Sequence, residues 1–199
     1  NNVWRRGERV WDTNSFFQGS FVKEVNDQFK TQVNAKYAFY RTHYVNNDDK
    51  LIEVDNLYKQ REVYVSTANM YTIFPFWDVS MSYDFQWNEM KADMYGFVFP
   101  TRFTNLLSIA TALRLGKVKL QGSGLATFVN DRVKEGPAPK ARQILTPAVF
   151  LSYKLFDKHD FSLRAFYKKT FRMPTFNDLY YADMGNSKLD PEYVTQYNL

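Results

Sequence analysis

One segment near the middle of the chain alternates strictly between apolar and polar residues. It spans residues 77–88 and reads W-D-V-S-M-S-Y-D-F-Q-W-N. Because successive side chains of a β-strand point to opposite faces, this pattern predicts a strand with one apolar and one polar face. Aromatic residues at both ends of the apolar face are typical of a strand that crosses a bilayer between two aromatic girdles. We expect the apolar set to face lipid and the polar set to face a barrel interior: Trp77, Val79, Met81, Tyr83, Phe85 and Trp87 against Asp78, Ser80, Ser82, Asp84, Gln86 and Asn88.

Other segments show the same alternation less strictly. In residues 161–172 the exceptions are Lys169 on the apolar side and Phe166 on the polar side. Residues 63–73 are rich in β-branched and aromatic side chains, which favour strands. The remaining candidates are residues 33–40, 103–115, 117–129 and 145–155.

Turn signals separate these segments, and short connections alternate with long ones. Residues 26–27, Gly116 and residues 157–160 are short, whereas residues 46–56 and 131–142 are longer and polar. Bacterial outer-membrane barrels have this asymmetry, with short periplasmic turns and long extracellular loops. We therefore expect both long loops on the extracellular side. Residues 177–181 alone favour a helical turn.

The pattern predicts an all-β chain of about eight to ten strands that forms part of a transmembrane antiparallel β-barrel. A soluble β-sandwich or strand-rich binding module also alternates and also turns often. Such a module would favour Val, Ile and Leu in its core and would use shorter strands than the 11–17 residues expected here.

Composition supports the membrane interpretation and excludes several functions. Phe, Tyr and Trp make up 18% of the 199 residues, whereas the mean hydropathy is −0.48. Many aromatic residues at low mean hydropathy mean that apolar and polar residues are interleaved. The sequence has no run of 18 apolar residues, so we expect no transmembrane helix. We also expect no signal peptide within residues 1–199. The net charge is +5, and the basic residues form no long run, so we expect no nucleic-acid partner.

The chemistry-bearing residues predict neither an enzyme nor a metal site. Cys is absent and His occurs twice, which excludes thiolate zinc sites and makes a multi-histidine site unexpected. No catalytic triad or phosphate-binding loop is visible. His43 and His159 fall at a strand end and in a turn, where solvated side chains are expected. Asp48 and Asp49 lie in a polar loop, where we interpret them as solvated charges. A calcium contact is the alternative interpretation.

Residues 165–199 carry the most specific motif. It consists of F-R-M-P at 171–174, T-F-N-D-L-Y at 175–180, and G-N at 185–186 followed by L-D-P-E at 189–192. Pro174 ends a strand because proline donates no ladder hydrogen bond, and Pro191 breaks the chain before a new strand. This block resembles the barrel of TonB-dependent outer-membrane receptors of the siderophore or nutrient uptake type. The motif residues are Phe171, Arg172, Pro174, Asn177, Leu179, Tyr180, Gly185, Asn186, Leu189, Pro191 and Glu192.

The resemblance implies a function and several partners. Receptors of this family have an N-terminal plug and a barrel of about 22 strands, so residues 1–199 would be a fragment of the barrel domain without the plug. It implies ligand-gated active transport of a scarce nutrient, such as a siderophore-type iron complex, across the bacterial outer membrane. Expected partners are outer-membrane lipid, the plug, an inner-membrane energy-coupling complex and a small-molecule ligand, with no cofactor.

The motif also predicts where ligand contact would occur. Arg172 continues the polar face of its strand with Arg164 and Lys168. A charged guanidinium in a barrel interior needs a partner or water, so we expect a plug carboxylate, an acid such as Asp84, or an anionic ligand beside it. The simpler interpretation is that the motif only builds a loop. The haem-uptake pattern is not matched, because Met173 replaces an alanine and no histidine lies between Pro174 and Asn186.

Two other functions stay open at this point. A small complete barrel of eight strands would serve as a structural or adhesion protein, because 199 residues suit that size. A soluble β-rich binding module would not need detergent for extraction. The sequence does not identify the transported ligand, because binding loops are the least predictable part of a barrel.

Overall fold

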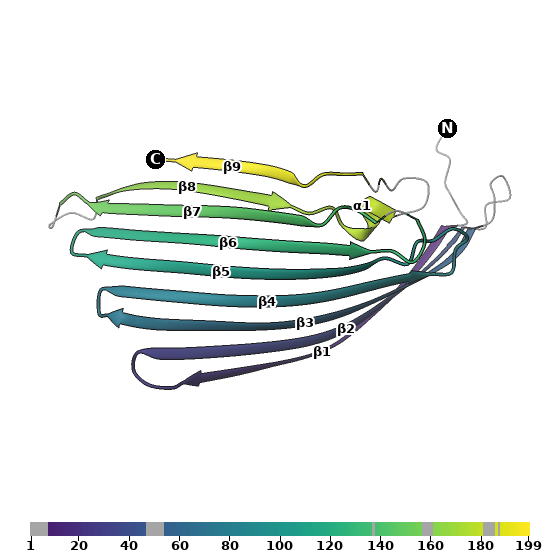
Figure 1. The fold of residues 1–199 in the computed structure, drawn as a ribbon, viewed down its shortest axis with the longest axis horizontal. Coiled ribbons are helices and arrows are strands. Elements are labelled where there is room, and N and C mark those ends of the chain that lie inside the picture. Colours follow the sequence, from purple (N-terminus) through teal and green to yellow (C-terminus); the bar gives the residue numbers. More distant parts are fainter. Residues whose placement is uncertain (1–7, 47–53, 137, 157–160, 181–185, 187) are drawn as a thin grey trace.

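The computed structural model describes residues 8–46, 54–136, 138–156, 161–180, 186 and 188–199. Within these ranges the chain forms one antiparallel sheet of nine strands that follow one another in chain order (Figure 1). A five-residue helix, α1 (Phe176–Tyr180), follows the eighth strand. No helix in the described ranges has the length and apolar character needed to cross a membrane. The strands are β1 (Glu8–Glu24), β2 (Phe29–Asn46), β3 (Val54–Phe74), β4 (Trp77–Ala92), β5 (Thr101–Leu115), β6 (Val118–Arg132), β7 (Arg142–Lys154), β8 (Ser162–Arg172) and β9 (Glu192–Asn198).

The strand number and fold class agree with the prediction, but two elements do not follow from the pattern. The pattern does not predict β1, because its apolar residues come in adjacent pairs such as Phe16–Phe17 and place one member on each face. Nor does it predict the connection 93–100 between β4 and β5. The longest strand, β3, has 21 residues, so the predicted segment 63–73 covers only its second half.

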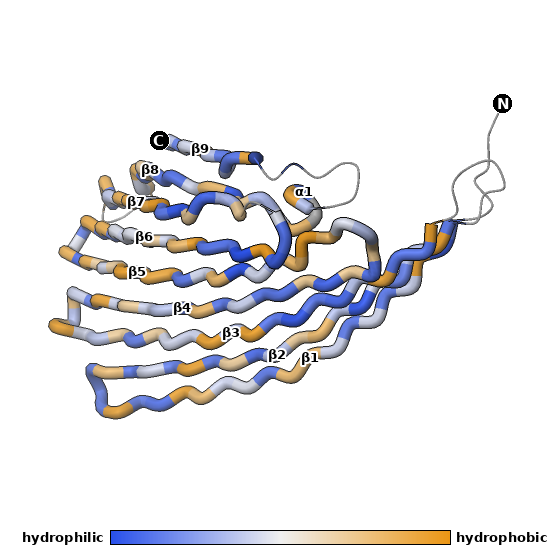
Figure 2. Tube along the Cα trace, turned by 45° about the vertical axis from the view of Figure 1, so that its right-hand side comes forward, coloured by the Kyte–Doolittle hydropathy of each residue, from blue (hydrophilic) through white to orange (hydrophobic). Residues whose placement is uncertain are grey.

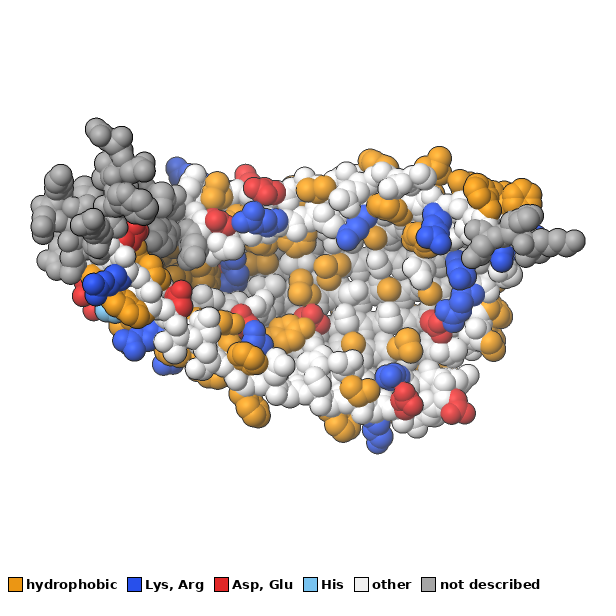
Figure 3. Space-filling model, turned by 180° about the vertical axis from the view of Figure 1, so that it is seen from behind, with side chains coloured by type: hydrophobic (Ala, Val, Ile, Leu, Met, Phe, Trp, Pro, Cys, Tyr) orange, Lys and Arg blue, Asp and Glu red, His pale blue; other side chains and the backbone are white. Residues whose placement is uncertain are grey.

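The two faces of the sheet differ in polarity as the alternation of β4 predicts. Antiparallel register places Met81 opposite Ile109 of β5 and Asn69 of β3, so residues of one phase line up across the strands. Figure 2 shows stretches of alternating hydrophobic and hydrophilic residues along several of the strands. The apolar phase lies on the convex face. The polar phase lies on the concave face, whose middle is hollowed and mostly neither hydrophobic nor charged (Figure 3).

The convex face exposes more apolar surface than a water-facing sheet tolerates. Met81 is 52% exposed, Ile109 59% and Leu145 66%. Soluble monomers rarely expose contiguous apolar patches of more than a few hundred Å², so this face requires a nonaqueous environment. The same face also carries Phe17, Phe21, Tyr83, Leu107, Val149, Leu151 and Leu163.

Long and short connections lie at opposite ends of the sheet, as predicted. At one end the strands are joined by residues 25–28, 75–76 and 116–117. At the other end the connections 93–100, 133–141 and 173–191 are longer (Figure 1). The loop 133–141 corresponds to the predicted 131–142. Residues 47–53 of the other predicted loop lie outside the described residues, but Asn46 and Val54 pair at this long-loop end. Residues 157–160 also lie outside them.

Candidate binding site at the long-loop end of the sheet

An apolar cluster closes part of the concave face at the long-loop end. Phe97 from the β4–β5 connection and Phe176 from α1 pack with Tyr58, Met90 and Ala92 of β3 and β4. Each of these five residues is buried. Two connections that are far apart in sequence therefore fold back onto the inner wall instead of extending into solvent. We call these five residues the mouth cluster.

The chain enters β5 through a strained residue. Phe99 has a φ of 48°, in the left-handed region that bulky residues rarely adopt. Its ring meets that of Phe97 edge-on at 5.4 Å, and the Lys134 ammonium lies 5.5 Å from the ring centroid. Conformations of this kind persist only where surrounding contacts determine them. The connection 93–100 is thus held in one conformation by packing.

A buried ion pair ties the motif loop to the barrel wall. Arg102 of β5 and Asp131 of β6 form two parallel hydrogen bonds, each of 2.7 Å, from Nε and Nη2 to the two carboxylate oxygens. The third guanidinium nitrogen donates to the carbonyl oxygen of Pro174 at 2.7 Å. The guanidinium carbon also lies 5.1 Å from the Phe176 ring centroid. The two charged side chains are only 12% and 4% exposed.

The start of α1 carries a reciprocal cap. The backbone N–H of Thr175 donates to the Asp178 carboxylate at 2.8 Å, and the N–H of Asp178 donates to the Thr175 hydroxyl at 3.2 Å. This is the capping-box arrangement that satisfies two otherwise unpaired helix donors. The backbone hydrogen bond from Thr175 lowers the pKa of Asp178, with smaller contributions from the Thr175 hydroxyl and the Arg172 charge.

The last residue of α1 points its phenol into the protein. Burial and, to a smaller extent, the Asp131 carboxylate raise the pKa of Tyr180 to about 12, and the Arg102 charge opposes the shift. The hydroxyl oxygen is buried without a hydrogen-bond partner among the described residues. Tyr180 therefore stays protonated at any physiological pH, and its ring serves the packing of α1 against the mouth cluster.

Arg172 does not pair with Asp84, one of the three kinds of partner expected for it. Its side chain is 67% exposed, and its partner is Asp178 of the same loop, at 3.7 Å. Asp84, the kind of interior acid expected beside it, instead accepts a hydrogen bond from Tyr64 at 3.0 Å. On β9 the residue opposite Arg172 is Glu192. Exposure leaves the guanidinium accessible to a ligand.

The other motif residues mostly build the loop. Leu179 is buried, and the Asn186 N–H donates to the Asp178 carbonyl oxygen at 2.9 Å. The Asn186 side chain accepts the Lys188 N–H at 3.0 Å, which turns the chain back toward β9. Phe171 pairs with Tyr193 of β9. Pro191 is buried just before β9 and Leu189 is exposed, whereas Gly185 and the side chain of Asn177 lie outside the described residues.

Arg102 and Asp131 are the important residues that the motif does not contain. A hairpin centred on the predicted turn at Gly116 places each residue of β5 opposite a residue of β6, and Arg102 then falls opposite Asp131. Residue identities at a hairpin register can therefore reveal a cross-strand ion pair. The candidate strands 103–115 and 117–129 stop just short of both residues, so the pair was not predicted.

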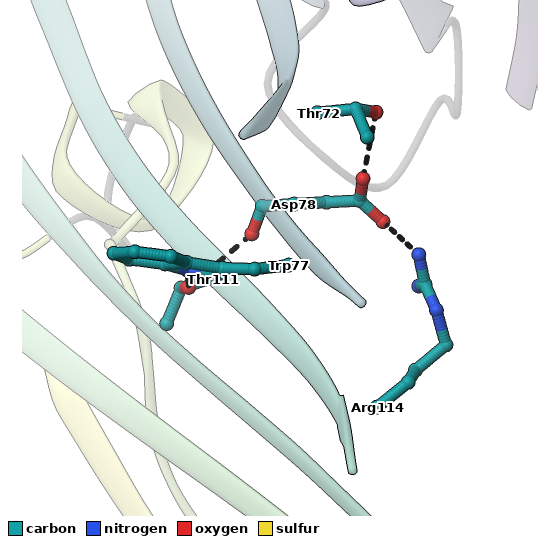
Figure 4. A network of polar contacts seen from close by, with 5 residues as sticks. All are labelled: Thr72, Trp77, Asp78, Thr111 and Arg114. Carbon is teal, nitrogen blue, oxygen red and sulfur yellow. Dashed lines mark hydrogen bonds and ion pairs between the residues drawn. The ribbon is translucent and has the colours of Figure 1, made fainter. Parts of the chain in front are cut away.

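A second polar network lies at the short-turn end (Figure 4). Asp78 accepts from the Thr72 hydroxyl at 2.8 Å and pairs with Arg114 at 2.5 Å, so strands β3, β4 and β5 are joined at the inner rim. On the outer side the Trp77 indole donates to the Thr111 hydroxyl at 2.8 Å. A buried or interfacial tryptophan commonly satisfies its N–H in this way. This network serves to hold the strand ends together.

The inner wall between the two networks contains an open cavity of about 530 Å³. Its lining includes Asp78, Ser80, Ser123 and Lys168, all from the polar phase of β4, β6 and β8. The lining also includes apolar residues such as Met70, Phe150 and Phe166, so the inner wall here is mixed in polarity. No three His, Cys, Asp or Glu side chains in the described ranges come together as metal ligands. His43 contacts Asp55 at 2.7 Å and stacks on Trp11, and His159 and Asp48–Asp49 lie outside these ranges.

Taken together, the fold defines a class: the wall of a transmembrane β-barrel, with polar residues inside, apolar residues outside and loops folded inward at one end. The whole chain, residues 1–199, matches the family model described as TonB dependent receptor-like, beta-barrel. The chain therefore belongs to this family, which consists of transport receptors. Barrels of this family reside in the outer membrane.

Solved structures share the fold. The chain is similar to the copper transporter OprC, with a TM-score of 0.78 and 15% identity over 97% of this chain and 36% of that chain. It is also similar to BauA, the ferric preacinetobactin receptor from Acinetobacter baumannii, with a TM-score of 0.54 and 14% identity over 96% of this chain and 34% of that chain. The chain thus spans about a third of the length of each. A comparison with curated proteins finds no match.

Proposed function

We propose that this chain forms part of the wall of a receptor that imports a scarce nutrient across the bacterial outer membrane by ligand-gated active transport. The observation that carries the proposal is the combination of an apolar convex face with a polar concave face, closed at the long-loop end by the mouth cluster. A wall of this kind separates lipid from a polar path and leaves room for a solute. Membership of the receptor family supports the same role.

The proposed receptor works with partners outside residues 1–199. We expect outer-membrane lipid on the convex face, a plug domain against the concave face, an inner-membrane energy-coupling complex and a small-molecule ligand. We expect no nucleic-acid partner, no cofactor and no catalysed reaction. As a barrel fragment, residues 1–199 would supply the wall and part of the mouth, whereas energy coupling would depend on the other parts.

A siderophore-type iron complex is the ligand that we propose from the motif. One structural neighbour is titled a ferric preacinetobactin receptor and another a copper transporter. Both names concern a metal as cargo, which supports a metal-containing nutrient without selecting iron. Arg172, exposed at the mouth, is the proposed ligand contact.

Energy-dependent uptake in cells tests this function. The gene is deleted, and iron accumulation is followed under iron limitation with and without a protonophore, with the full-length receptor restored from a plasmid as control. We expect accumulation to fall on deletion, to return with the plasmid and to be abolished by the protonophore. Uptake that is insensitive to the protonophore would contradict active transport, and unchanged iron uptake with altered uptake of another nutrient would contradict only the iron assignment.

A further inference from the structure

A second, smaller pocket lies on the concave face next to the mouth cluster, with a volume of about 320 Å³. The antiparallel register builds it, because Tyr40 pairs with Gln60 and Thr42 pairs with Tyr58, so residues of one phase on β1 to β4 converge. The volume is at the lower end of the range for small-molecule sites. Its lining is uncharged and rich in tyrosine: Val10, Tyr40, Thr42, Tyr44, Tyr58, Gln60 and Met90.

Hydrogen bonds hold the lining side chains in place. The Tyr44 hydroxyl donates to Glu8 at 2.8 Å, and the Thr42 hydroxyl donates to Asp12 at 2.6 Å. The Tyr58 hydroxyl donates to the Met94 sulfur at 3.1 Å. Side chains that are already ordered lose little conformational freedom when a ligand binds. The tyrosine rings are therefore positioned before a ligand arrives.

The charge around this pocket is negative. Glu8 and Asp12 lie on the same face of β1 as Val10, and each carboxylate touches a lining hydroxyl. Within the described residues, neither pairs with a Lys, Arg or His side chain. Lys36 reaches the Tyr40 hydroxyl at 3.4 Å, but its charge is balanced by Glu62 at 3.0 Å. An anion would be repelled here, whereas a cation would be attracted.

We propose that this tyrosine pocket is a subsite for an organic cation, a quaternary ammonium or similar group carried by the transported solute. Aromatic faces attract cations through their quadrupole, and tyrosine cages are a common way to bind quaternary ammonium groups. Glu8 and Asp12 add long-range attraction at the edge without entering the pocket. The proposal rests on the proposed transport function, because a receptor needs a binding site at its mouth.

Binding of choline to the purified full-length receptor in detergent tests the subsite. Its neutral isostere 3,3-dimethylbutan-1-ol has the same shape without the charge. We expect calorimetry to show choline binding in the millimolar range and several-fold weaker binding of the isostere. Asp12→Asn and Tyr40→Leu should each weaken choline binding about two- to five-fold, whereas Tyr40→Phe, which keeps the aromatic face, should leave it unchanged.

Two matched variants on the same strands serve as controls. Glu24→Gln removes a carboxylate of β1 that pairs with Lys30 at the opposite end, and Tyr37→Leu removes an exposed tyrosine from the convex face of β2. Neither should change choline binding. Equal affinity for both probes, absence of choline binding, or full affinity in the folded Asp12→Asn and Tyr40→Leu variants would overturn the subsite. Protonophore-sensitive nutrient uptake in cells, measured separately, decides whether the transport function itself stands.

Discussion

Arg102 and Arg172 lie at the same end of the concave face but differ in what surrounds them. Arg102 is buried, bidentate to Asp131, and bound to the motif loop through the Pro174 carbonyl oxygen. Arg172 is exposed and has one long ion pair with Asp178. A buried charge must keep its partners because losing them leaves an unsolvated ion, whereas an exposed ion pair contributes little stability. The structural role thus belongs to Arg102 and leaves Arg172 available for ligand.

Replacing Arg102 tests the structural role. We expect Arg102→Ala to destabilise the receptor by about 3 kcal/mol, because Asp131 is left buried without a cation. Urea unfolding of the full-length receptor, together with hydrogen exchange of residues 173–180, measures the effect. The matched control is Arg114→Ala, which removes the more exposed ion pair with Asp78 and should cost less than about 1 kcal/mol. Equal costs for the two variants would contradict the assignment.

Replacing Arg172 tests the ligand contact. We expect Arg172→Ala to lower nutrient uptake in cells while the barrel stays assembled and heat-modifiable on gels. The barrel should stay assembled because the Arg172 side chain is exposed and adds little to stability. Full uptake in this variant would show that the motif only forms a loop and does not contact the ligand. Loss of the assembled barrel would instead show that Arg172 is structural.

The cap of α1 makes the order of this helix depend on pH. The pKa of Asp178 is lowered in the folded state, so its contribution is fully present above the ordinary aspartate pKa of about 4. It is lost as the pH falls through the lowered folded value. We expect hydrogen-exchange protection of residues 176–180 to be constant between neutral pH and about pH 5 and to fall below about pH 4. Asp178→Asn should abolish this dependence, and an unchanged acid response in that variant would assign it to another group.

At the scale of a strand, neighbouring residues face opposite sides of the sheet, so one of them meets lipid and the next meets the barrel interior. Ile109 of β5 is exposed on the convex face, whereas its neighbour Ser108 faces the concave side opposite Ser82. We expect Ile109→Lys to destabilise the barrel by about 2–4 kcal/mol in lipid, the cost of a lysine near the bilayer midplane. Ser108→Lys should cost much less because the interior is polar. Unfolding in lipid vesicles distinguishes the two, and similar costs would contradict the membrane orientation.

The same alternation explains why the sequence predicts β4 as a strand but does not predict β1. In residues 77–88 of β4 every apolar residue belongs to one phase, whereas β1 places Phe16 and Phe17 on opposite faces. On a strand with mixed faces, periodicity loses its signal even though the backbone still pairs over 17 residues. Pairing with β2 therefore determines that β1 is a strand.

At the scale of the whole molecule, the nine described strands form an open sheet with β1 and β9 at its edges. Such edges carry unpaired backbone groups that invite association, and the convex face adds exposed apolar side chains. We expect residues 1–199, produced alone, to need detergent to stay dispersed and to associate without it. Size-exclusion chromatography with and without detergent measures this. A dispersed monomer in plain buffer would favour a soluble module.

The sequence by itself determined most of the strands, their faces and the order of short and long connections, but not β1. These features are local, since they depend on period-two alternation and on turn residues, and the F-R-M-P block identified the family before any contact was visible. It also indicated the helical turn that became α1 and placed Arg172 on the polar phase of β8.

Only the tertiary structure decided which side chains meet at the mouth. The mouth cluster unites residues of β3 and β4, the connection 93–100 and α1, which are separated by more than a hundred positions from first to last. Whether an arginine is buried or exposed depends on which loops fold over it. Arg102 and Arg172 have the same chemistry and both lie on inward phases, so no local pattern separates them. The curvature of the sheet and the inward path of the loops determine which arginine is buried against Asp131 and which is left facing water.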